Sequence, residues 1–178
     1  MTDTETRTAS GSPFWRFSLQ FYRQPSVADA CIALQEQSGV DVNLLLFLLW
    51  QATQQRSFSP NEVAALEARI GPWREATVVP LRAVRRALKA PPTLVAPATA
   101  EAFRTRIKAV ELEAERLQQE AMYELARGNA APGSAAGSSA DAARTSLKSY
   151  ATMRGVAFAK PAVETLLAAF TTLHGRGE

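Results

Sequence analysis

The sequence predicts an all-α protein, a compact helical bundle around a buried central helix. Apolar residues recur at intervals of three and four along almost the whole chain, which is the spacing of one face of an α-helix. No segment alternates apolar and polar residues as a half-buried strand would, and no Asn-Gly or Asp-Gly pair marks a hairpin. The 178 residues, of which 47% are apolar, suit one domain with an ordinary core and a small appendage.

Three helices are expected in the first third of the chain. The first begins after Ser12, with a proline at its first position, and the second ends at Ser38-Gly39. The third, at about residues 41–55, contains the apolar run Leu44–Trp50. This run is too short to cross a bilayer, which takes roughly 20 residues, so it belongs in the core. Asp41 stands where the N-cap of this helix belongs.

Two further helices are expected before residue 90. A capping box formed by Ser59 and Glu62 begins the fourth helix, and Gly71-Pro72 is expected to end it. The fifth helix runs over about residues 73–89 and contains Pro80. Because proline removes a helical hydrogen bond and crowds the preceding turn, this helix should be kinked or split.

A long helix is predicted at about residues 97–127, with a heptad-like apolar seam typical of a coiled coil. The seam consists of Phe103, Ile107, Val110, Ala114, Leu117 and Ala121. We expect the chain to divide into a disordered tail (1–12), a helical domain (13–127), a flexible linker (128–140) and a C-terminal helical pair (141–173) that docks on the main domain.

Basic residues gather between the fifth helix and the start of the long helix, and they are the main candidates for anion or partner binding. They are Arg82, Arg85, Arg86, Lys89, Arg104, Arg106 and Lys108. The long helix thereby carries bases at its start and acids in its second half, against the preference of the helix dipole. These basic residues can form a solvated face, be neutralised by an acidic helix, or bind an anionic partner. Alternatively, the long helix can pair antiparallel with that of another copy, so that basic and acidic halves meet.

Other reactive side chains favour structural roles. Glu111, Glu113 and Glu115 are interpreted as a solvated face that forms ion pairs with Lys108 and Arg116. The single cysteine, Cys31, lies on an apolar stripe, and the single histidine, His174, lies in the C-terminal tail. We therefore expect no catalytic triad, no metal site and no cofactor, and the lone cysteine favours a reducing, cytoplasmic setting.

Four segments in order, FWRFSLQFY, DVNLLLFLLW, VVPLRAVRRALK and RIKAVELEAERLQQ, resemble a family of small bacterial conserved hypothetical proteins, a domain of unknown function. The resemblance covers most of residues 14–126. It implies an all-helical bacterial protein and brings no activity, cofactor or catalytic residue.

The sequence favours a non-enzymatic protein that binds a protein partner or a second copy through the long helix. The alternative is a binder of nucleic acid or an acidic membrane surface through Arg82–Lys108, which predicts steep salt dependence. A third hypothesis is an enzyme in which Asp41, Asn43 and Arg16 join Arg82 in one cleft that binds a small anion. No transmembrane segment is expected.

Overall fold

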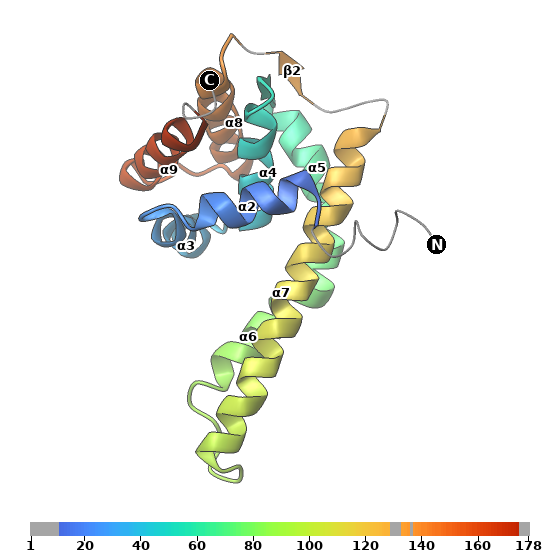
Figure 1. Cartoon of the computed structure of the whole chain (residues 1–178), viewed down its shortest axis with the longest axis vertical. Helices are drawn as coiled ribbons and strands as arrows, with labels where there is room; N and C mark the ends of the chain where they lie inside the picture. Colours follow the sequence, from blue (N-terminus) through green and yellow to red (C-terminus); the bar gives the residue numbers. More distant parts are fainter. Residues whose placement is uncertain (1–10, 129–132, 136, 175–178) are drawn as a thin grey trace.

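Helices form nearly all the regular structure in the computed structural model, which describes residues 11–128, 133–135 and 137–174 (Figure 1). The all-α prediction is therefore confirmed. The elements in chain order are α2 (Pro13–Tyr22), α3 (Val27–Ser38), α4 (Val42–Ala52), β1 (Arg56–Ser57), α5 (Pro60–Trp73), the π-helical turn η1 (Arg74–Val78), α6 (Val79–Ala87), α7 (Pro97–Arg127), β2 (Ser134–Ala135), α8 (Ser139–Arg154) and α9 (Lys160–His174).

Local capping chemistry sets several helix ends where the sequence predicts them. The Ser12 hydroxyl accepts a hydrogen bond from the Trp15 N–H at 3.1 Å and so caps α2. Ser59 and Glu62 form the predicted capping box at the start of α5. Gly39 ends α3 in the left-handed conformation with φ 61°, which only glycine adopts without strain.

The apolar helix α4 lies at the centre of the bundle, as the sequence predicts. The side chains from Leu44 to Leu49 are all buried, and α2, α7 and α8 pack around them. Phe14 of α2 meets Phe47 edge-to-face with ring centroids 5.4 Å apart, and it stacks on the half-buried Trp50 at 5.3 Å. Burial of this run against several helices supplies the hydrophobic stabilisation that fixes the orientation of α4.

The expected end of the fourth helix at Gly71-Pro72 is wrong. Pro72 lies inside α5, which passes directly into η1 and then α6. Tertiary contacts outweigh the local breaker signal, since the Trp73 indole N–H donates to the Ala114 carbonyl at 3.0 Å and Ile70 is buried. The five-residue π turn comes just before Pro80 and accommodates it without ending the helical path.

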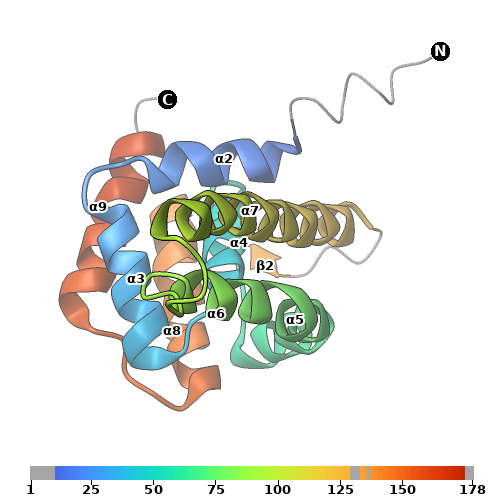
Figure 2. The same cartoon turned by 90° about the horizontal axis from the view of Figure 1, so that it is seen from below.

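The helices α6 and α7 run antiparallel and project from the rest of the bundle as an arm (Figures 1 and 2). At a rise of 1.5 Å per residue, α7 is about 46 Å long, so its first half extends well beyond the core. The seam of α7 is only partly covered: Ala114 is buried, whereas Phe103, Val110 and Leu117 remain 43%, 52% and 43% exposed. An exposed apolar seam on a projecting helix is unusual for a monomer.

Part of the predicted linker, 128–140, is held against the bundle. Residues 129–132 and 136 lie outside the described residues, as do residues 1–10 of the predicted tail. The described part contains β2, which pairs antiparallel with β1, and Gly133, whose N–H donates to Glu62 at 3.1 Å. Beyond it, α8 and α9 contribute to the same core as α4, with the buried side chains Leu147, Tyr150, Leu166 and Phe170.

Candidate functional site

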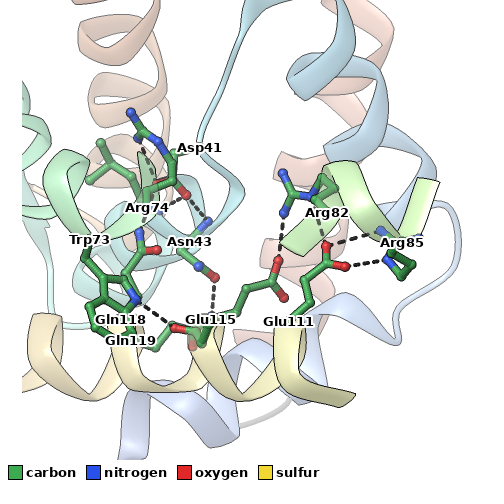
Figure 3. A network of polar contacts seen from close by, with 12 residues as sticks. Asp41, Asn43, Trp73, Arg74, Arg82, Arg85, Glu111, Glu115, Gln118 and Gln119 are labelled. Carbon is green, nitrogen blue, oxygen red and sulfur yellow. Dashed lines mark hydrogen bonds and ion pairs between the residues drawn. The ribbon is translucent and has the colours of Figure 1, made fainter. Parts of the chain in front are cut away.

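Asp41 joins four helical segments at the start of α4 (Figure 3). Its Oδ1 accepts hydrogen bonds from the N–H groups of Asn43 and Leu44 at 2.7 and 3.3 Å, which confirms its role as N-cap. Its Oδ2 accepts from Arg74 Nη1 at 3.0 Å and from Gln118 Nε2 at 2.9 Å. Its own N–H donates to the Tyr150 hydroxyl of α8 at 2.8 Å. A carboxylate with this many donors is a structural junction.

Arg74 holds this junction from η1. Its Nη2 donates to Glu67 at 2.6 Å and its Nε donates to Glu75 at 3.1 Å, in addition to the bond with Asp41. The hydrogen bond to Glu67 is the largest cause of a raised pKa for the Arg74 guanidinium, which stays charged. A second polar contact lies beside it, where Gln119 Nε2 donates to Asn43 Oδ1 at 2.8 Å.

The basic face of α6 meets the acidic part of α7 rather than its basic start. Arg82 donates to Glu111 at 3.0 Å and to Glu115 at 2.7 Å, and Arg85 forms a two-point pair with Glu111 (Figure 3). The interpretation of the glutamates as a solvated face is therefore wrong for Glu111, which is buried. The register of the two helices explains this, because it places Arg82 and Arg85 beside Glu111 and Glu115. Glu113, by contrast, is exposed and pairs with Arg116 as expected.

The two glutamates of this cluster have opposite pKa shifts. Burial alone would raise the pKa of Glu111, but hydrogen bonds from Arg85 and Arg82 outweigh burial and lower it. Burial also acts on Glu115, and here it outweighs the attraction of Arg82, so the pKa of Glu115 is raised. Most of the charge on Arg82 and Arg85 is thus compensated within the chain.

A cavity of about 920 Å³ lies between α2, α3, α4, η1, α6 and α7. Two of the three residues proposed for a cleft, Asp41 and Asn43, line it together with Arg82. The third, Arg16, does not line it, and its guanidinium donates to the Gly11 carbonyl at 2.8 Å. The cavity is also lined by the predicted basic residues Arg85, Arg86, Lys89 and Lys108.

Arg104 and Arg106 lie apart from this cavity. Arg104 forms an ion pair with Glu101 at 2.8 Å, one helical turn away, and the guanidinium of Arg106 lies 5.5 Å from the centre of the Phe103 ring. Arg86 reaches Glu36 of α3 at 3.4 Å, and both side chains are more than half exposed. The predicted basic group therefore divides between the cavity and the outer part of the arm.

The sequence reasoning missed Ser18, Arg74, Gln118 and Gln119. Ser18 lies within the stripe of phenylalanines on α2, and the two glutamines follow a run of charged residues on α7, where they resemble solvent-facing positions. They are nevertheless buried and line the cavity. Ser18 Oγ, Gln118 Oε1 and Gln119 Oε1 have no hydrogen-bond partner among the described residues.

The cysteine and the histidine, Cys31 and His174, both pack against neighbouring side chains. Burial raises the pKa of the Cys31 thiol to about 12, and its side chain is fully covered. His174 ends α9, where it stacks on Phe170 and lies 3.1 Å from the Ser139 hydroxyl. Over the described ranges, no cluster of three or more His, Cys, Asp or Glu residues suits a metal ion, and no helix is long and apolar enough to cross a membrane.

Comparison with known proteins confirms the family expected from the sequence. No curated protein and no solved structure is significantly similar to the chain. A family model matches residues 13–122, which include α2 to α6 and most of α7, and so contain the cavity apart from Arg154. The chain belongs to the family described as "Protein of unknown function (DUF2390)".

Proposed function

We propose that the protein is an interaction protein whose arm pairs antiparallel with the arm of a second copy. The observation that carries this proposal is the α7 strip, defined as Phe103, Val110, Leu117 and Ala121, which is exposed on the projecting helix. Its first three residues recur every seven positions, the period at which one helix covers another in a coiled coil. From Phe103 to Leu117 the strip is about 21 Å long.

Charge favours the antiparallel orientation. Arg106 lies near one end of the strip, and Glu120 and Glu124 lie near the other. A two-fold axis between Glu113 and Ala114 would set Val110 opposite Leu117 and bring Arg106 of each copy next to the acidic end of the other. Because such an interface is self-complementary, two copies close it and no filament forms.

A second cavity offers a place for an aromatic anchor. It has a volume of about 450 Å³ between α5 and α7 and is lined mainly by apolar side chains, among them Ile70, Trp73, Leu117, Ala121 and Leu125. The same two-fold axis places Phe103 of the second copy opposite Glu124, beside this cavity. Large aromatic side chains that enter a pocket of the partner dominate the energy of many interfaces.

Light scattering coupled to size exclusion tests the proposal on the full chain. The wild type should have twice the 19.3 kDa mass of one chain. The Val110→Asp variant should have the mass of the monomer, because the substitution would bury a charge in the interface. Phe103→Ala should weaken the dimer through loss of the anchor. Val156→Asp is the matched control, since Val156 is 42% exposed but lies before α9, and it should leave the mass unchanged. A wild type that stays at 19.3 kDa at high concentration would refute the proposal.

The alternative, an anionic partner on the basic face Arg82–Lys108, has weaker support. Arg82 and Arg85 already bind Glu111 and Glu115, which leaves fewer charges for phosphates. Nucleic-acid binding that depends on several phosphate contacts falls steeply with salt. A gel-shift experiment with DNA and RNA at low salt, beside flotation with acidic liposomes, tests it: binding that Lys89→Gln and Lys108→Gln abolish would favour it over the dimer.

A further inference from the structure

The larger cavity is built differently from an ordinary surface groove, because its lining includes buried polar atoms that lack partners. Ser18, Gln118 and Gln119 are only 3%, 3% and 2% exposed, yet one oxygen of each has no hydrogen-bond partner among the described residues. A buried polar group without a hydrogen-bond partner costs about 1–3 kcal/mol, so three such groups beside one cavity call for an explanation.

The hydrogen bond to Asp41 fixes which end of the Gln118 amide is unpaired. Gln118 Nε2 donates to the Asp41 carboxylate, which as an ion can only accept, so Gln118 Oε1 must be the free atom. Gln119 Nε2 donates to Asn43 Oδ1; because both groups are amides, the opposite arrangement, with Asn43 donating to Gln119, satisfies the same contact, so the unpaired end of Gln119 can be an acceptor or a donor. The Gln118 carbonyl oxygen and the Ser18 hydroxyl can accept hydrogen bonds from hydroxyl or amine groups, and the Gln119 amide can accept or donate one.

Cations line another part of the same cavity. Lys89 of α6 and Lys108 of α7 are exposed lining residues, and neither takes part in an ion pair among the described residues. Each carboxylate of the lining is bound to an arginine and so competes little for these lysines; they are Glu36, Asp41, Glu75, Glu111 and Glu115. Lys89 and Lys108 are therefore free to bind an anionic group.

The distance between the two regions sets the size of the ligand. Lys108 and Gln118 are ten residues apart on one straight helix, which corresponds to about 15 Å. The lining also includes apolar side chains such as Leu19, Leu46 and Leu112. The volume of about 920 Å³ is at the upper end of the usual range for small-molecule sites. A lone phosphate would reach only one of the two regions.

We propose that this cavity binds a small organic phosphate of nucleotide size. The phosphate group binds Lys89 and Lys108, and hydroxyl or amine groups at the other end donate to Ser18 and Gln118, beside the Gln119 amide. The site is separate from the α7 strip and does not depend on dimer formation.

Isothermal titration of the full chain with the four nucleoside monophosphates tests the proposal, with adenosine and inorganic phosphate as partial ligands. At least one nucleotide should bind more tightly than about 1 mM, and both partial ligands should bind about tenfold more weakly or worse. Lys108→Gln should weaken binding about tenfold, and Ser18→Ala about fivefold, through loss of one hydrogen bond each. Lys148→Gln, a matched change on an exposed face of α8, should leave the affinity unchanged.

Three results would overturn the proposal. They are the absence of binding by all four nucleotides, inorganic phosphate or adenosine binding as tightly as the best nucleotide, and equal affinity of the Lys108 and Lys148 variants. Circular dichroism verifies that each variant is folded. Light scattering of the same samples separates the two proposals, because the variants at Ser18 and Lys108 should keep the oligomeric state of the wild type.

Discussion

Replacing Asp41 with alanine should be among the most damaging single changes in the chain. The substitution removes the cap from two N–H groups of α4, which costs about 1 kcal/mol. It also leaves the buried Gln118 amide without its charged acceptor, at a cost of about 2 kcal/mol. Loss of the ion pair with Arg74 costs less, about 1 kcal/mol, because Arg74 keeps its pairs with Glu67 and Glu75. Together the free energy of unfolding should fall by about 4 kcal/mol.

Urea unfolding followed by circular dichroism measures this change, with the slope of the transition compared between proteins. Asp41→Asn should cost about 1 kcal/mol less than Asp41→Ala, since asparagine caps a helix as well as aspartate does. Asp29→Ala is the control: Asp29 is exposed in the first turn of α3, and its loss should cost about 0.5 kcal/mol. The reasoning fails if Asp41→Ala costs less than about 1.5 kcal/mol or if the asparagine variant is no more stable.

Two further changes test the contacts around this junction. Glu111→Gln should lower the free energy of unfolding at pH 7 by about 2 kcal/mol, because two arginines lose their charged partner. Since the pKa of Glu111 is lowered by folding, its stabilisation is complete above about pH 4.3, the unfolded value, and is lost as the pH falls through the folded value. The difference from wild type, measured by urea unfolding, should therefore shrink below about pH 4; a constant difference would contradict the pairing. Tyr150→Phe should cost about 1–2 kcal/mol in the same assay by leaving the Asp41 N–H unpaired. Tyr22→Phe, at a residue that is 38% exposed, should cost less.

Structural features that a few neighbouring residues determine were predictable from the sequence. The capping box at Ser59, the cap at Asp41 and the glycine end of α3 depend on a few consecutive residues, and the structure has all three. The central position of Leu44–Leu49 follows because an all-apolar helix has no face that can meet water.

Features that depend on the register between distant segments were not predictable. The pairing of Arg82 with Glu111 and Glu115 requires the offset between two antiparallel helices, which the loop length alone does not fix. Gln118 and Gln119 become buried because α2, α4 and η1 pack on α7. Pro72 stays inside a helix because contacts made by the next residue, Trp73, outweigh its local effect.

Cysteine cross-linking tests most directly the proposal that two arms pair antiparallel. Arg106→Cys and Ala121→Cys lie opposite one another across the proposed two-fold axis, so a mixture of the two variants should form a disulfide-linked dimer under mild oxidation. Neither variant alone should do so. The native Cys31 does not interfere, because it is buried and its pKa is raised to about 12. Cross-linking of each variant with itself, or no cross-link in the mixture, would contradict the account.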